Sequence, residues 1–217
     1  MSAQEARISF RHQDVPHSAD RSTVRPHDAP RPASFFAPGA EIYAQGETCA
    51  GLYRIEFGAV RVYRLLADGR RQISAFHLPG ETFGFEAGSV HHFFAEAICA
   101  TGIHILRGSP RHDLPDRLLP LALESLVRAQ EHLLVLGRHN AVERIAAFLT
   151  DMAERQGGLQ QVELPMSRAD IGDYLGLTIE TVSRVFSKLK QKGVIRLPSL
   201  RSVEILKWKA LHDLAGE

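Results

Sequence analysis

The chain has 217 residues, which is enough for one or two compact domains. Its 26 basic and 25 acidic residues give a net charge of +1, and 44% of the residues are hydrophobic, so global disorder, collagen-like repeats and supercharged tails are excluded. The two cysteines, Cys49 and Cys99, cannot build a disulfide framework. The sequence has no secretory signal pattern and no apolar run of about 18 residues, so we expect a cytoplasmic protein.

A flexible tail is predicted for residues 1–34, which carry four of the eleven prolines and almost no periodic apolar residues. From residue 35 the pattern changes to short β-branched and aromatic runs separated by glycines. Asp68-Gly69 lies between AVRVYRLL and RQISAFHL, which predicts a hairpin turn. We therefore expect an antiparallel β-roll, or jelly-roll-like domain, over residues 35–115.

Leucine dominates the next segment, residues 116–139, in which a helix is predicted from Pro120 to about Arg138. A stripe in steps of three and four runs along it: Leu119, Leu123, Leu126, Gln130 and Leu133. This spacing is typical of a coiled-coil seam and suits a symmetric dimer. Packing of the same stripe on the chain's own β-roll would explain the spacing equally well, so both interpretations remain open.

A winged helix-turn-helix domain is predicted for residues 140–217. Ser167 opens a capping box that starts a short helix, Gly176 ends that helix, and Thr178 caps a second one. Apolar residues face the space between the two helices: Ile171, Leu175, Leu177, Val182, Val185 and Leu189. Two short strands around Pro198-Ser199 predict the wing.

The outward stripe of the second helix is the candidate reading surface. Glu180, Ser183 and Arg184 share one face, so they would enter a major groove together. Arginine can donate two hydrogen bonds to guanine, and glutamate can accept one from cytosine. An i,i+4 ion pair between Glu180 and Arg184 is the alternative explanation. Backbone or flanking DNA contacts are expected from Ser167, Thr178, Ile179, Thr181, Ser187, Lys188, Lys190 and Arg201.

The near-neutral total charge conceals a basic C-terminal segment. Residues 184–209 contain eight basic residues and one acidic residue, a net charge of +7, and they include all five lysines of the chain. Lysine and arginine near a reading helix position it by contacting phosphates. We therefore expect double-stranded DNA as a partner.

The succession of a β-roll, a leucine-rich helix and a winged helix-turn-helix resembles the CRP/FNR family of bacterial transcription regulators. The similar motifs are GETCAGLYRIEFGAVRVYR, LPGETFG, GRHNAVERIAAFL and ETVSRVFSKL. The resemblance implies an α+β fold with a cyclic-nucleotide-binding-like roll, a homodimer, and contact with RNA polymerase rather than enzymatic activity. Glu180, Ser183 and Arg184 are similar to the FNR-branch triad, which implies TTGA-type half-sites in inverted repeat, with Arg184 reading the guanine.

Two sensing devices of this family are not expected in this chain. Cyclic-nucleotide members supply an Arg-Ser pair late in the roll, whereas residues 81–106 hold no arginine or lysine, and Phe93-Phe94 stand near that place. Oxygen-sensing members bind an iron–sulfur cluster through N-terminal cysteines, and residues 1–48 have none. The chain thus resembles the FixK type, which implies activation of microaerobic, anaerobic or nitrogen-fixation genes without a cofactor.

An effector-gated regulator of the same family, responding to haem, nitric oxide or thiol oxidation, is the alternative. Some FixK-type proteins carry an oxidisable cysteine where this chain has Ser167. Cys49 is then the candidate redox residue, because it follows Gly46 in a predicted loop, whereas Cys99 is expected in the core.

A cupin-like metalloprotein is the rival from another functional class, suggested by His91, His92 and Glu96. Adjacent residues of a strand point to opposite faces, so the two histidines would not share a metal without a bulge. A metalloenzyme also needs three converging ligands. We therefore predict no metal site and no catalytic residue.

Overall fold

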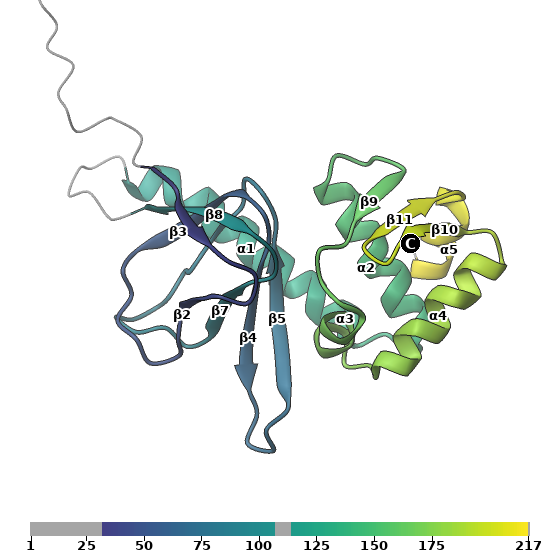
Figure 1. The fold of residues 1–217 in the computed structure, drawn as a ribbon, viewed down its shortest axis with the longest axis horizontal. Helices are drawn as coiled ribbons and strands as arrows, with labels where there is room; N and C mark the ends of the chain where they lie inside the picture. Colours follow the sequence, from purple (N-terminus) through teal and green to yellow (C-terminus); the bar gives the residue numbers. More distant parts are fainter. Residues whose placement is uncertain (1–31, 107–113, 217) are drawn as a thin grey trace, which may run out of the picture. The chain divides into compact units, whose positions relative to one another are not determined.

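The computed structural model describes residues 32–106 and 114–216 (Figure 1). Residues 1–31 of the predicted tail lie outside the described residues. No helix in the described ranges combines the length and the apolar character that a membrane span requires.

The N-terminal domain is a roll of two four-stranded antiparallel sheets, as predicted. One sheet has the order β1-β8-β3-β6 and the other β2-β7-β4-β5. The strands are β1 (Ser34–Phe36), β2 (Glu41–Tyr43), β3 (Leu52–Phe57), β4 (Val60–Leu65), β5 (Arg71–His77), β6 (Thr82–Phe83), β7 (Phe94–Ala97) and β8 (Thr101–Leu106). The predicted turn joins β4 to β5, and Gly69 adopts a φ of +81°, which side-chain-bearing residues rarely adopt.

The roll has one core inside and contributes to another outside. Tyr43, Tyr53 and Phe83 fill the interior between the two sheets with aromatic contacts. Ile73 and Phe76 of β5 belong instead to the hydrophobic cluster of the C-terminal helices. The register shifts between the Val62–Ala75 and Tyr63–Ile73 pairs, and this bulge at Ser74 brings Ile73 and Phe76, which are three residues apart, to the same face of the sheet.

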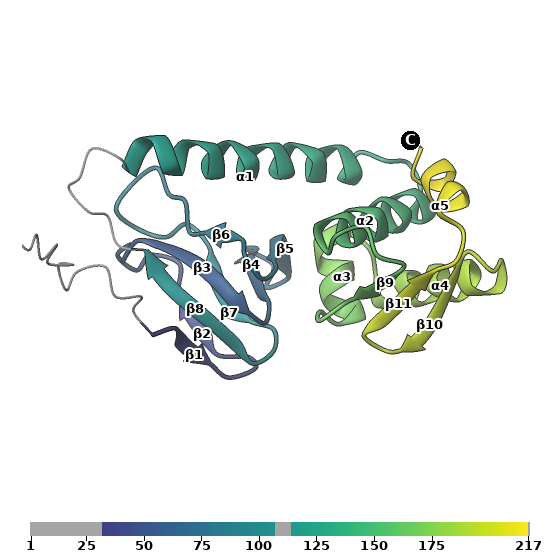
Figure 2. The same cartoon turned by 90° about the horizontal axis from the view of Figure 1, so that it is seen from above.

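Helix α1 (Leu114–Leu136) follows the roll and runs without interruption (Figure 2). It begins six residues before Pro120, so the predicted start is wrong. Pro115 occupies the first turn, where a missing N–H has no helical partner to lose. The helix continues through Pro120 at the cost of one backbone hydrogen bond.

The C-terminal domain is a winged helix-turn-helix with the predicted order of elements. It contains α2 (Ala141–Arg155), β9 (Gln161–Glu163), α3 (Arg168–Leu175), α4 (Ile179–Gln191), β10 (Ile195–Ser199), β11 (Ser202–Ile205) and α5 (Trp208–Ala215). The wing turn falls at Leu200-Arg201, two residues later than predicted, because β10 continues through Pro198. Strand β9 completes a three-stranded sheet of order β10-β11-β9.

Candidate nucleic-acid interface

Helix α3 begins with the predicted capping box. The Asp170 backbone N–H donates to Ser167 Oγ at 3.1 Å, and the Ser167 backbone N–H donates to Asp170 Oδ2 at 3.0 Å. Two helix-end N–H groups are thereby satisfied without water. The serine predicted as a DNA backbone contact therefore has its hydroxyl committed to the helix start.

The turn between α3 and α4 depends on two glycines. Gly176 adopts a left-handed φ of +64° and ends α3. A Cβ on Gly172 would lie 2.6 Å from the carbonyl oxygen of Leu177, so only glycine permits the observed approach of the two helices. Gly172 therefore permits the close packing on which the helix-turn-helix depends.

The recognition helix α4 presents an exposed polar stripe. Thr178 caps it by accepting a hydrogen bond from the Thr181 N–H at 3.2 Å. Glu180, Ser183 and Arg184 are all solvent-exposed, while Val182, Val185, Phe186 and Leu189 on the other face are buried. The structure therefore brings the three candidate base-reading residues to one free surface of the helix.

The alternative explanation for Glu180 and Arg184, an ion pair between them, is not realised among the described residues. The Arg184 guanidinium instead lies 3.5 Å from Thr181 Oγ1, a long and weak contact. The pKa of Glu180 is lowered by its own backbone N–H, then by Thr178, and then by the charge of Arg184. Both side chains keep hydrogen-bonding capacity for a ligand.

The expected flanking contacts surround this stripe. Exposed Ile179, Ser187, Lys188 and Lys190 lie on α4, and exposed Arg201 lies at the wing turn. Ser187 donates its hydroxyl to the carbonyl of Ser183 at 2.9 Å, which leaves its oxygen free to accept. Thr181 is half-buried and occupied by the Thr178 hydroxyl.

Arg168 is a residue that the sequence analysis missed. Its guanidinium carbon lies 3.4 Å from the centre of the Phe186 ring, a cation–π contact that joins α3 to α4. Burial lowers its pKa to about 10, and its buried Nη1 has no hydrogen-bond partner among residues 32–106 and 114–216. The sequence shows a basic residue directly after the Ser167 cap. A charged residue at a helix start ordinarily faces solvent, so its contact with Phe186 was not predicted.

The leucine stripe of α1 is not covered by the described part of the chain. Leu119, Leu123, Leu126 and Leu133 are 51–67% exposed, and Gln130 is exposed as well. Val127 and Leu134 widen the stripe. The interpretation in which these leucines pack on the chain's own roll therefore finds no support in the described residues.

Cys49 lies between β2 and β3, beside the buried His91. Its Sγ is 3.6 Å from His91 Nδ1, and His91 stacks on Tyr43 with ring centres 3.6 Å apart. Partial burial and the negative charge of Glu86 raise the pKa of the Cys49 thiol, which disfavours the reactive thiolate. The redox role of Cys49 stays a prediction, and Cys99 is partly buried against the core.

His91 is buried and His92 is exposed, in line with their opposite orientations along the chain. Glu86 bonds to His92 Nδ1 at 2.6 Å, whereas Glu96 instead pairs with Arg61. In residues 32–106 and 114–216, no group of three histidine, cysteine, aspartate or glutamate side chains is arranged to hold a metal ion.

A cavity of about 260 Å³ is lined by roll residues that include Phe83 and Phe93, and by Arg128 and Arg155. Both arginines bond to Glu81: Arg128 Nη1 at 3.0 Å, and Arg155 Nε and Nη2 at 2.9 Å. Burial alone would raise the pKa of Glu81, but hydrogen bonds from His77 and Arg155 lower it to about 2. Both guanidinium groups that line the cavity are thus already paired with carboxylates: Arg128 with Glu81 and Glu124, and Arg155 with Glu81 and Asp151.

Comparison with known proteins agrees with this architecture. A model of the cyclic nucleotide-binding domain matches residues 33–110, and a model of the Crp-like helix-turn-helix domain matches residues 143–214. The nitrogen fixation regulation protein FixK of Rhizobium meliloti (strain 1021) is 57% identical over 191 residues, covering 88% of this chain and 90% of that protein.

Solved structures give the same result. FixK2 from Bradyrhizobium japonicum is 41% identical with a TM-score of 0.78, over 84% of this chain and 96% of that one. A CRP/FNR family transcriptional regulator from Thermus thermophilus is 25% identical with a TM-score of 0.69, over 85% and 98%. These similarities extend over both the roll and the winged helix-turn-helix domain. The chain therefore belongs to the CRP/FNR family of DNA-binding transcription regulators, in its FixK-like branch, and is not an enzyme.

Proposed function

We propose that this protein is a homodimeric, cytoplasmic transcription activator of microaerobic, anaerobic or nitrogen-fixation genes that reads TTGA-type half-sites in inverted repeat. The observation that carries the proposal is the exposed stripe of Glu180, Ser183 and Arg184 on a closed helix-turn-helix. RNA polymerase is the partner that activation would require. The physiological assignment is supported by the names of the FixK relatives.

The stripe suits base reading because its groups are available. Within the described part of the chain, Arg184 makes no side-chain contact beyond the long one to Thr181, so its guanidinium group can donate to guanine O6 and N7. Lys188 and Lys190 flank it with the positive charge that phosphates attract. In this assignment Arg184 reads the guanine, Glu180 the opposite strand and Ser183 a flanking base.

We further propose that DNA binding needs no cyclic nucleotide or other cofactor. The cavity beside the roll, at about 260 Å³, is smaller than most ligand sites, which occupy about 300–1,000 Å³. Arg128 and Arg155 share Glu81, and each has a second carboxylate partner, Glu124 and Asp151 respectively, so both arginines already have partners in place of a phosphate. Purified protein should therefore bind its site without an added effector, and strict dependence on cAMP, haem or nitric oxide would contradict this.

The exposed stripe of α1 suits the interface between two copies of the chain. A row of leucines at coiled-coil spacing, with one polar Gln130, buries well against its own symmetry mate. Two-fold symmetry would then place the two copies of α4 in successive major grooves, roughly 34 Å apart.

Selection of bound sequences from a random DNA pool tests the site. We expect an inverted repeat with TTGA-type halves, and selection of a single unrepeated site would contradict the two-fold arrangement.

Sedimentation equilibrium tests the proposed dimer interface on α1 separately. The unmodified chain should be dimeric at micromolar concentration, and Leu126→Lys should shift it toward the monomer, whereas Leu200→Lys, at the exposed wing turn, should not.

A further inference from the structure

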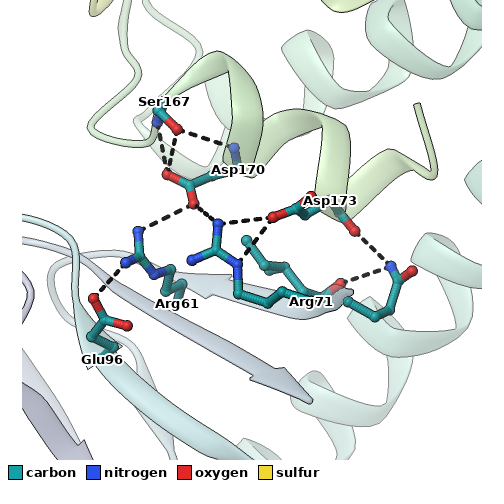
Figure 3. A network of polar contacts seen from close by, with 8 residues as sticks. Arg61, Arg71, Glu96, Ser167, Asp170 and Asp173 are labelled. Atoms are coloured by element: carbon teal, nitrogen blue, oxygen red, sulfur yellow. Dashed lines mark hydrogen bonds and ion pairs between the residues drawn. The ribbon is translucent and has the colours of Figure 1, made fainter. Parts of the chain in front are cut away.

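A polar network joins the outer face of the roll to the first turns of α3 (Figure 3). Arg61 of β4 and Arg71 of β5 both donate to Asp170 Oδ1, at 3.1 Å and 2.5 Å. Arg71 also donates through Nε and Nη2 to Asp173 Oδ2, at 3.0 Å and 2.8 Å. Arg61 is paired on its other side with Glu96.

Asp170 divides its two oxygens between two tasks. Oδ2 accepts from the Ser167 N–H and hydroxyl and so completes the capping box, while Oδ1, among the described residues, accepts from the two roll arginines alone. The side chain is 4% exposed. A buried carboxylate that lost these arginines would keep its charge without compensation, which is far more costly than losing a surface pair.

The arginines are themselves fixed in place. The side chain of Arg61 is 17% exposed and that of Arg71 is 25% exposed. The Arg71 guanidinium also lies 5.5 Å from the Tyr63 ring centre. Burial alone would lower the pKa of Arg71, but Asp173 and Asp170 raise it, so it stays charged. Gln72 adds a hydrogen bond to the Asp173 carbonyl oxygen at 2.7 Å.

What holds α3 also holds the recognition helix. Gly172 brings α3 against the turn before α4, and Arg168 stacks on Phe186 of α4. The two helices are therefore packed against each other at both of these contacts. We propose that Arg61 and Arg71 are positioning residues for DNA reading: through Asp170 and Asp173 they fix the orientation of α4 from the outer sheet of the roll, with no ligand required. This inference rests on the proposed function.

The test compares Arg71→Gln with Arg70→Gln in the full-length protein. Arg70 lies in the same hairpin, its side chain is 77% exposed, and it bonds to Asp68 within the turn, so it is a matched control for the lost charge. Arg71→Lys keeps the charge, but its single ammonium group cannot reproduce the forked contacts to both aspartates. The readouts are hydrogen exchange of the free protein and affinity for the selected DNA at several salt concentrations.

Without DNA, Arg71→Gln should accelerate amide exchange in α3 while β3 and β8 inside the roll keep their protection. Uniform acceleration across the chain would indicate a merely structural role and overturn the proposal. With DNA, we expect affinity to fall about tenfold, as for a reader whose competent orientation is populated about a tenth of the time. Arg71→Lys should recover part of this loss, and Arg70→Gln should match the unmodified chain.

The salt dependence separates positioning from direct contact. Loss of a phosphate contact lowers the slope of log affinity against log salt by about 0.9, whereas Arg71→Gln should leave the slope unchanged. Unchanged affinity, unchanged α3 exchange or a reduced slope would each overturn the proposal. Failure of the unmodified chain to bind any DNA would count against the proposed function alone, because the exchange comparison needs no DNA.

Discussion

Helices α3 and α4 both begin at a side-chain cap and both lie near arginine, but these arginines differ in their surroundings. At α3, Arg61 and Arg71 are largely buried and committed to Asp170. At α4, Arg184 is exposed and makes a long contact to Thr181. An arginine indicates a binding surface only where its N–H donors are unoccupied. An arginine whose donors are used inside a buried network stabilises the packing of the fold instead.

The largest effect is expected from a change that disrupts the packing of α3 against α4, on which both the buried network and the exposed stripe depend. Gly172→Val would place a branched side chain against the Leu177 carbonyl oxygen, where even a Cβ would lie at 2.6 Å. We expect a loss of about 3 kcal/mol in the free energy of unfolding, as in severe overpacking, together with loss of DNA binding.

Urea unfolding and a gel shift measure the two effects of Gly172→Val. Gly88→Val is the control, because a Cβ at Gly88 meets nothing within 4 Å and the backbone there is not left-handed. Equal stability of the two variants would contradict the proposed close approach.

Asp170→Asn addresses the buried network without touching the reading stripe. Breaking a buried pair costs about 3–5 kcal/mol, but asparagine keeps one acceptor oxygen and the arginines are partly exposed, so we expect about 2 kcal/mol of lost stability at pH 7. Asp68→Asn, in an exposed turn, should leave stability nearly unchanged.

The same variant makes a pH prediction. Burial raises the pKa of Asp170, but hydrogen bonds from Ser167 and the charges of Arg61 and Arg71 lower it below its ordinary value of 3.8. A carboxyl with a lowered folded-state pKa stabilises the fold above that ordinary value, and this contribution is lost as the pH falls below it. Urea unfolding at pH 7 and pH 3 should therefore show a smaller gap between the unmodified chain and Asp170→Asn at the lower pH.

Arg184→Ala tests the exposed stripe. In contrast to Asp170→Asn, it should weaken DNA binding and leave stability unchanged. We expect DNA binding to weaken by about 1–3 kcal/mol with relaxed preference at the guanine, and no change in unfolding. Lys188→Gln is the comparison: it should reduce the salt dependence and leave sequence preference intact. Retained affinity and selectivity in Arg184→Ala would remove Arg184 from the reading stripe.

The smallest effect is expected for Thr178→Ala at the start of α4. Unlike the cap of α3, Thr178 is exposed and, among the described residues, bonds within its own helix, so its loss should cost the ordinary cap value of about 1 kcal/mol in unfolding free energy. Thr178→Ser keeps the accepting oxygen and should be nearly neutral. A cost as large as that of Asp170→Asn would remove the contrast between the two caps.

The helix-turn-helix could be predicted from the sequence because the residues that start and end its helices act locally. Ser167, Gly176 and Thr178 act on backbone groups within a few residues, so their types and spacing are sufficient. The Asp68-Gly69 turn was predictable for the same reason. The start of α1 was misplaced because Pro115 and Pro120 are both compatible with a first turn, and local rules did not rank them.

The network around Asp170 was not predictable in this way. Arg61 and Asp170 are 109 positions apart, and no periodicity marks an arginine that will face another domain. Asp170 was predicted as part of the capping box, which explains the contacts of Oδ2. That role gave no indication that Oδ1 would bind the two arginines of the roll. The shared outward position of Ile73 and Phe76 was missed similarly, since alternation along β5 would put them on opposite faces and no sequence signal marked the bulge between them.

The divided carboxylate of Asp170 has a consequence for how the molecule comes apart. Because one side chain both starts α3 and binds the roll, fraying of that helix releases the roll arginines, and departure of the roll weakens the helix start. The two events are thermodynamically linked, so the sheet of β4 and β5 and the helix-turn-helix should melt as one cooperative unit. A single calorimetric transition in the unmodified chain, splitting into two in Asp170→Asn, would be the signature of that linkage.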